Sequence, residues 1–236
     1  MMVLRKASER GYAHHGWLES WHSFSFADYN DPAHVHFGPL RVINEDIVQP
    51  GTGFGTHGHR DMEILTYVLS GTLRHRDSTG SSGDIHYGEV QMMSAGIGVQ
   101  HREVNPSPDE AVHLLQIWIM PDRQNLTPLY QQKEFPLEDK LARWCLLASP
   151  DAASDKAGDS LLIHQDARVF ASRLDGAATL DYVLAAERKA YLHIARGSLH
   201  ANGYELVAGD ALMYEDEVAV QLSEAKDAEL LLFDMG

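Results

Sequence analysis

The chain alternates short apolar stretches, rich in Val, Ile, Leu and Tyr, with breaks made of Gly, Ser, Asp and Pro. These stretches run for about four to eight residues between turn signals, a length that favours strands over helices. The clearest of them cover residues 64–69, 90–93, 113–120, 182–185 and 229–233. We expect Ser70-Gly71 to close a hairpin between 64–69 and 72–76. Many short strands at this spacing predict an all-β sandwich or barrel of jelly-roll type with little helix.

A short internal repeat predicts that the chain forms two lobes. Residues 68–73 (Val-Leu-Ser-Gly-Thr-Leu) are similar to 194–199 (Ile-Ala-Arg-Gly-Ser-Leu), and 88–92 are similar to 209–213 in the same order. A duplicated strand–turn–strand unit is the economical explanation. The stretch 121–141 carries three prolines among polar residues, which indicates a connector with one short helix. We therefore expect an N-terminal lobe over 1–125, a connector over 126–140 and a C-terminal lobe over 141–236.

The composition excludes several classes of protein. The chain has 236 residues, with 34 acidic against 19 basic side chains and a formal net charge of −15. A surface this acidic repels phosphate groups, so we expect no direct binding to nucleic acid or to a membrane. No apolar run reaches the length of about 18 residues that a spanning helix needs. The single cysteine, Cys145, excludes an internal disulfide framework and favours a cytoplasmic location.

Histidine is the residue type that points to chemistry. Of 14 histidines, eleven lie between His14 and His113. A glycine-rich approach ends in the pair His57-x-His59, and His101-x-Glu103 follows further on. Residues i and i+2 of a strand point to the same face, so each pair projects together. Two such strands facing each other would place three imidazoles and one carboxylate around one point, a donor set that suits a divalent first-row metal.

The other histidines and the aromatic residues show no comparable pattern. His34 and His36 form a second His-x-His pair without a partner pair, so we expect a pocket-wall or hydrogen-bonding role there. We expect four histidines to be solvated polar residues: His14, His15, His75 and His86. We expect core or lid packing from five aromatic residues: Trp17, Trp21, Phe24, Phe26 and Phe37. The chain has no Gly-x-Ser-x-Gly elbow, which argues against a serine hydrolase.

With these residues in place, the sequence resembles the cupin superfamily and, within it, the pirin family. The first cupin motif is matched by Gly51, His57, His59, Glu63 and Gly71. The second is matched by Gly88, Gly96, His101 and Asn105, with Ser94 in place of the usual proline. The pirin pattern is matched by residues 21–26, 37–44, 57–63 and 93–103. The resemblance covers at least residues 17–120 and implies a bicupin, that is, two jelly-roll barrels in one chain.

The resemblance also implies a ligand set. It assigns one divalent transition metal to His57, His59, His101 and Glu103, and we expect iron(II), with nickel, copper, manganese, cobalt or zinc as alternatives. It implies that Glu63, a ligand in many other cupins, stays off the metal. Position 58 often carries proline in the family, and Gly58 departs from that pattern.

The second lobe keeps little of this ligand set. The offsets of the internal repeat place four residues at the ligand positions: Val183, Ala185, Leu222 and Glu224. One carboxylate alone does not hold a metal, so we expect a single metal per chain and a structural C-terminal lobe. Two lobes in one chain can pack on each other as two cupin subunits would, which favours a monomer.

The family offers two different functions. Some bacterial pirin-like proteins with this pattern cleave flavonols such as quercetin by 2,3-dioxygenation, and the resemblance implies the same activity here. The substrates would be a flat aromatic molecule and dioxygen, with Glu103 as the catalytic proton acceptor. The alternative is a metal-binding regulatory pirin that modulates a protein partner without turnover. A cupin oxygenase or isomerase with another substrate is a third possibility.

Overall fold

The computed structural model describes residues 1–152 and 160–236, which form two compact units. The N-terminal unit comprises Gly11–Glu134 with Ile163–Gln165. The C-terminal unit comprises Met1–Arg10, Phe135–Leu162 and Asp166–Gly236. These units differ from the predicted lobes at the start of the chain. Strand β1 (Met2–Arg5) hydrogen-bonds to β19 (Ala211–Tyr214), so the first ten residues belong to the C-terminal unit.

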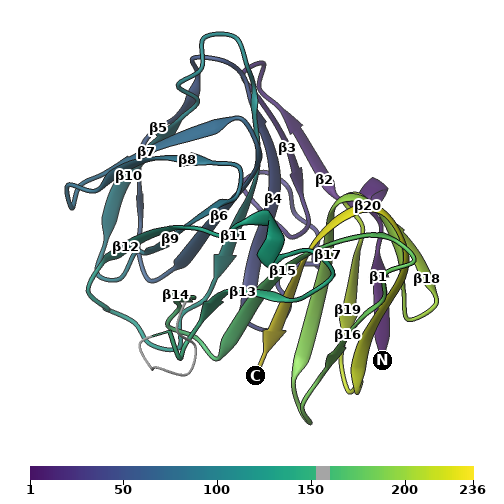
Figure 1. The fold of residues 1–236 in the computed structure, drawn as a ribbon. Coiled ribbons are helices and arrows are strands. Elements are labelled where there is room, and N and C mark those ends of the chain that lie inside the picture. Colours follow the sequence, from purple (N-terminus) through teal and green to yellow (C-terminus); the bar gives the residue numbers. More distant parts are fainter. Residues whose placement is uncertain (153–159) are drawn as a thin grey trace. The chain divides into compact units, whose positions relative to one another are not determined.

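The N-terminal unit is built from two antiparallel sheets (Figure 1). The seven-stranded sheet has, in order, β12 (Leu129–Glu134), β9 (Glu89–Ser94), β6 (Glu63–Ser70), β11 (Val112–Ile119), β4 (Leu40–Val48), β3 (Leu18–His22) and β2 (Gly11–His14). The four-stranded sheet has β5 (Gly53–His59), β10 (Val99–Val104), β7 (Thr72–Asp77) and β8 (Ser82–His86). Val68 and Leu114 of the first sheet pack in one buried cluster with Leu73 and Ile85 of the second. The apolar faces of the two sheets thus share one core, as a jelly-roll sandwich requires.

The connection at Gly71 differs from its prediction. Strands β6 and β7 lie in different sheets, so Ser70-Gly71 does not close a hairpin and that prediction is wrong. Gly71 has φ +77°, and a Cβ there would lie 2.7 Å from the carbonyl oxygen of Ala111. Only glycine tolerates both this backbone conformation and this close approach, so the chain turns there from one sheet to the other. The true hairpin comes next, because β7 pairs with β8.

The C-terminal unit is a nine-stranded sheet with the order β1-β19-β17-β20-β15-β13-β14, in which β16 pairs with β20 and β18 with β17. Its remaining strands are β13 (Cys145–Ser149), β14 (Leu161–Leu162), β15 (Ala167–Gly176), β16 (Leu180–Val183), β17 (Lys189–Ala201), β18 (Tyr204–Val207) and β20 (Ala219–Met235). Register shifts interrupt the pairing of β17 with β20, and such irregularities bend long strands. Leu192, Leu212 and Leu232 lie in the buried core of this unit.

The strand predictions agree with the structure except near residue 184. Residues 64–69, 90–93 and 229–233 lie within β6, β9 and β20, and 113–120 coincides with β11 to within one residue. The stretch 182–185 overlaps β16 only in part. The prediction of an all-β fold with little helix is confirmed. The helices of the described ranges are two short 3-10 turns, Ala7–Glu9 and Leu137–Asp139. Neither is long and apolar enough to cross a membrane.

The internal repeat and the predicted connector both have counterparts in the backbone. Gly71 and Gly197 have φ values of +77° and +66°, and Gly88 and Gly209 have +93° and +85°. Each repeated glycine therefore adopts the left-handed conformation of its equivalent. Residues 126–140, predicted as a connector, contain β12, which pairs with β9 in the N-terminal unit, and a 3-10 turn in the C-terminal unit.

Candidate metal centre

Three histidines meet where β5 and β10 pair in the four-stranded sheet. His57 lies directly opposite His101, and His59 follows two residues later on the same face. The ring centroids of His57 and His59 lie 4.4 and 4.7 Å from that of His101. One ring nitrogen from each of the three lies within 4.8 Å of the others. The structure thus brings these three predicted residues together, because the two-residue period of each strand sends them to one face.

Glu103 lies beside this cluster rather than inside it. The register of β10 on β5 shifts between His101 and Glu103, so Glu103 faces Phe54 across the pair. One oxygen of the Glu103 carboxylate lies within 4.8 Å of a ring nitrogen of His101 and of a ring nitrogen of His75. A side chain at Gly53 would meet the backbone carbonyl of Glu103, so the glycine lets β5 approach β10 at this point.

The Glu103 carboxylate is buried and only half satisfied. The side-chain amide of Gln116 donates a hydrogen bond of 2.9 Å to Oε2. Oε1 is buried and has no hydrogen-bond partner in the described part of the chain. Burial, with the nearby charge of Asp46, raises the pKa of Glu103 to about 7 despite the Gln116 bond. An unpartnered buried oxygen is costly, and a cation or a proton would satisfy it.

The hydrogen bonds around His57 and His101 fix which ring nitrogens are free. Nδ1 of His57 lies 2.8 Å from the carbonyl oxygen of Gly55 and must donate its proton to it. In the neutral ring this leaves Nε2 without a proton and with a free lone pair. Behind the cluster, His101 Nδ1 lies 3.4 Å from His75 Nδ1, and His75 Nε2 lies 3.0 Å from the Asp77 carboxylate. Burial acts to raise the pKa of Asp77, but hydrogen bonds from Thr79 and His75 outweigh it, so this carboxylate is ionised and accepts.

These contacts form a series of hydrogen-bonded side chains in which the position of each ring proton affects the next. His75 donates to Asp77 through Nε2 and offers its Nδ1 as an acceptor both to His101 Nδ1 at 3.4 Å and to the Gln91 amide at 3.5 Å; when His101 carries its proton on Nδ1, its Nε2 is bare. The two bare nitrogens, Nε2 of His57 and Nε2 of His101, lie 3.0 Å apart. In that tautomer two lone pairs face each other and a cation between them is stabilising, whereas a proton on Nε2 of His101 makes the same contact a hydrogen bond. Burial also lowers the pKa of His59 to about 4 and that of His101 to about 3, so both rings are neutral, as metal ligation requires.

His75 corrects one expectation from the sequence. It was predicted to be a solvated polar residue, but its side chain is fully buried between His101 and Tyr130, whose ring stacks on it at 4.8 Å. The pattern of β7 contains the signal: His75 shares a face with buried Leu73, while Arg74 and Arg76 point the other way. His75 thus orients His101 from behind.

We expect His75→Ala to weaken divalent metal binding by about 10- to 100-fold, the usual effect of losing a group that orients a ligand. The measurement is the dissociation constant for nickel(II) by titration of metal-free protein. His86→Ala is the matched control, because His86 is exposed on the neighbouring strand β8 and its ring bonds the hydroxyl of Thr72, away from the histidine cluster. An unchanged constant in His75→Ala would show that His75 does not position His101.

Two groups of possible metal ligands occur among the described residues: His57, His59 and His101, and His75, His101 and Glu103. Glu63 and the second His-x-His pair lie outside both clusters. Glu63 is buried on β6 and accepts hydrogen bonds from the Ser94 hydroxyl at 2.9 Å and from the backbone N–H of His164 at 3.1 Å. His34 pairs with Asp31 at 2.7 Å, and His36 bonds the carbonyl oxygen of Gly38 at 3.0 Å. Their expected hydrogen-bonding role agrees with these contacts.

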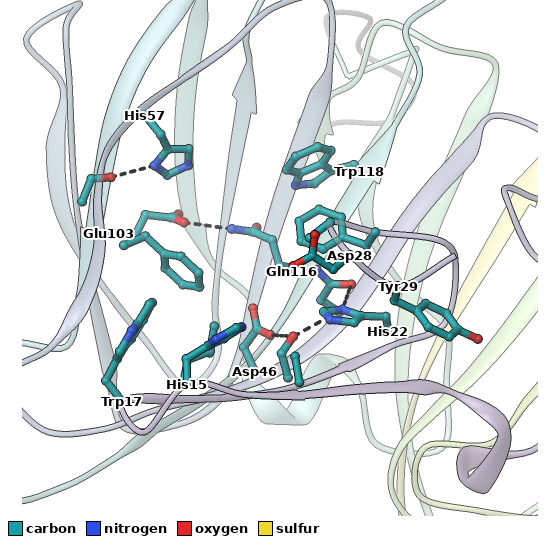
Figure 2. Close-up of a pocket in the computed structure, with 18 of the residues that line it drawn as sticks. His15, Trp17, His22, Asp28, Tyr29, Asp46, His57, Glu103, Gln116 and Trp118 are labelled. Atoms are coloured by element: carbon teal, nitrogen blue, oxygen red, sulfur yellow. Dashed lines mark hydrogen bonds between the residues drawn. The ribbon is translucent and has the colours of Figure 1, made fainter. Parts of the chain in front are cut away.

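A cavity of about 750 Å³ opens beside the candidate centre (Figure 2). Glu103, His57 and His59 form part of its lining. Its aromatic lining consists of Tyr12, Trp17, Phe26, Tyr29, Phe54 and Trp118. Trp17 and Phe26 were expected to pack in the core or a lid, and they serve as walls here. The volume and the aromatic walls are those of a small-molecule site for a flat ligand.

A second polar group lies in the same cavity, on β3 and β4. It consists of Ser20, His22, Asn44 and Asp46, and we call it the polar floor. The hydroxyl of Ser20 donates to Asp46, and His22 Nδ1 lies 2.9 Å from the side-chain oxygen of Asn44 (Figure 2). Sequence reasoning missed these residues. The signal was the alternation of β4, in which Asn44 and Asp46 occupy the same buried face as Val42 and Val48.

The comparison with protein-family models assigns both halves of the chain. Residues 3–119 match the family model Pirin, and residues 146–235 match a quercetinase C-terminal cupin domain. A quercetin 2,3-dioxygenase of Escherichia coli K12 is 46% identical over 235 residues, which cover 100% of this chain and 99% of the relative. The chain belongs to the pirin family. This finding confirms the resemblance seen in the sequence.

Solved structures of pirins agree with this assignment. The crystal structure of YhhW from Escherichia coli is 46% identical, covers 100% of this pirin and 98% of its own chain, and superposes with a TM-score of 0.94. A second crystal structure, of the bacterial pirin YhhW in complex with nickel(II), has 46% identity, covers 100% and 99% of the two chains, and has a TM-score of 0.93.

Proposed function

We propose that this pirin is a metal-dependent dioxygenase that cleaves flavonols such as quercetin at the 2,3-bond. The observation that carries the proposal is the place of the histidine cluster: His57 and His59 line the aromatic cavity together with Glu103. A flat phenol bound there would reach the metal-ligating groups and be shielded from water by the walls. The relatives named above support the substrate class, because a full-length relative is a quercetin 2,3-dioxygenase.

The proposed ligands are His57, His59, His101 and Glu103, holding one divalent metal per chain. The facing bare nitrogens of His57 and His101 and the unpartnered oxygen of Glu103 support this set. Imidazole and carboxylate suit most first-row ions, and we propose iron(II) as the native one, although a related pirin structure holds nickel(II). Such an ion supplies Lewis acidity toward the substrate's 3-hydroxyl oxygen and an open position for dioxygen.

The residues of the chain then have separate tasks. Glu103 would act in turn as metal ligand and as base: Oε1 would leave the metal to accept the proton of the 3-hydroxyl, because Gln116 already occupies Oε2 and holds the carboxylate in place. Trp118 packs edge-on against His59 at 4.9 Å and closes the cavity on that side. Asp77 and His75 keep the proton of His101 on the side away from the cluster. We further propose a monomer that works in the cytoplasm.

The test is to add quercetin to the purified, metal-loaded protein and follow both its visible absorbance and oxygen uptake. We expect quercetin loss that is matched by oxygen uptake and proportional to bound metal. If iron, nickel, copper, manganese and cobalt forms all leave quercetin unchanged, the dioxygenase proposal fails and the regulatory function becomes the better account.

A further inference from the structure

The polar floor contains a buried carboxylate with unusually little support. Asp46 is 3% exposed, and among the described residues it forms no ion pair and has one hydrogen-bond partner, the hydroxyl of Ser20. A buried carboxylate normally requires a cation or several donors, because burial removes its hydration. Asp46 therefore lies where a further donor would be stabilising, and its side chain faces the cavity (Figure 2).

The polar floor lies close to the residue that holds Glu103. Asn44 lies directly opposite His22 on β3 and directly opposite Gln116 on β11, and Asp46 lies directly opposite Ser20. Neighbouring strands are about 5 Å apart. The floor therefore begins on the strand next to the one that carries Gln116, and Gln116 contacts Glu103. A ligand that reaches Glu103 with one ring can therefore reach the floor with another.

The groups around the floor favour an aromatic ring with hydroxyls. The ring of Phe26 lies 5.3 Å from that of His22, and Tyr29 stacks on His22 at 6.2 Å. The floor itself is rich in acceptors: the Asp46 carboxylate, the Asn44 amide oxygen and the Ser20 hydroxyl. Such a set recognises hydroxyl donors, and a buried acceptor rejects an analogue that lacks them.

We propose that the polar floor is a subsite for the two adjacent hydroxyls on the pendant phenyl ring of a flavonol. In quercetin these are the only two hydroxyls that lie on neighbouring carbons. The floor thereby selects flavonols that carry a catechol from those with a bare phenyl ring. This inference rests on the proposed function for its substrate class, while its test measures binding alone.

The experiment compares two flavonols that differ only at this ring: quercetin, with both hydroxyls, and galangin, with neither. Their dissociation constants are measured without oxygen on nickel(II)-loaded protein, by quenching of tryptophan fluorescence, since Trp17 and Trp118 line the cavity. At a pH above the pKa of about 7 to which burial raises Asp46, we expect the unaltered protein to bind quercetin about 10- to 100-fold more tightly than galangin, the effect of a hydrogen bond to a charged group.

Asp46→Asn should reduce this preference to about twofold or less while galangin affinity stays within about twofold. Glu45→Gln is the matched control, because Glu45 is the adjacent carboxylate of β4 and pairs with His113 at 2.9 Å instead. Its preference should equal that of the unaltered protein. Ser20→Ala, which removes one hydroxyl-binding group of the floor and the hydrogen bond that positions Asp46, should lower the preference in the same direction and replaces Asp46→Asn as the test if that variant does not fold.

Equal affinities of the unaltered protein for the two flavonols would overturn the subsite, and so would an equal loss of both in Asp46→Asn. A preference for quercetin that Asp46→Asn abolishes, in a protein that consumes no oxygen, would uphold the subsite and refute only the dioxygenase proposal. The two inferences therefore fail in different ways.

Discussion

Glu103→Gln is expected to lower quercetin turnover by about 10²- to 10⁴-fold, the usual effect of removing a positioned general base. Glutamine keeps the shape of the side chain but removes the basicity of Oε1, which has no other partner in the described part of the chain. Some metal should remain, because three imidazoles persist in the cluster. The measurement is steady-state quercetin loss divided by the metal content of the same sample.

Glu63→Gln is the matched control for that variant. Glu63 is another buried glutamate of the N-terminal unit, but its partners are Ser94 and His164 and it lies outside both clusters. We expect Glu63→Gln to lower quercetin turnover per bound metal by at most about 10- to 100-fold, the usual effect of losing a group that supports the metal ligands without touching the metal. Full activity per metal in Glu103→Gln, with none in Glu63→Gln, would refute both the proposed ligand and the proposed base.

His57→Ala and His101→Ala should each lose the metal and the dioxygenase activity yet remain folded. Each change removes one of the two nitrogens that face each other at 3.0 Å, whereas the stability of the unit comes from the apolar core between its sheets. Elemental analysis should find one metal per chain in the unaltered protein and almost none in these variants. His36→Ala, whose exposed ring bonds only Gly38 among the described residues, should keep its metal.

Two results would contradict this account of the metal. The first is two equivalents bound by the unaltered chain, since both histidine-containing clusters of the described residues share His101. The second is a far-UV circular dichroism spectrum of His57→Ala that has lost its β signal, which would mean that the ion rather than the core maintains the fold.

The sequence predicted those parts of the site that depend on spacing within one strand. The pairs His57/His59 and His101/Glu103 follow from the two-residue period alone, and the structure brings the three histidines together. The register shift on β10 was not predictable in this way, and it explains why Glu103 lies beside the cluster. Such a shift depends on how two strands distant in sequence pair.

The remaining parts depend on contacts between distant strands. The polar floor joins β3 to β4, and the burial of His75 depends on Tyr130 of β12, more than fifty positions away. Gly71 shows a similar limit: a glycine turn between two strands is equally compatible with a hairpin and with a crossing between sheets. The strand pairing shows the crossing, because β6 and β7 belong to different sheets.

The most direct test of the central claim is turnover of quercetin under oxygen-18 gas, followed by mass spectrometry of the ring-opened product. A 2,3-dioxygenase places both atoms of one dioxygen molecule in its products, so we predict that the label appears there and that label supplied as water does not. Unchanged quercetin, or oxygen derived from water in the ring-opened product, would contradict the account.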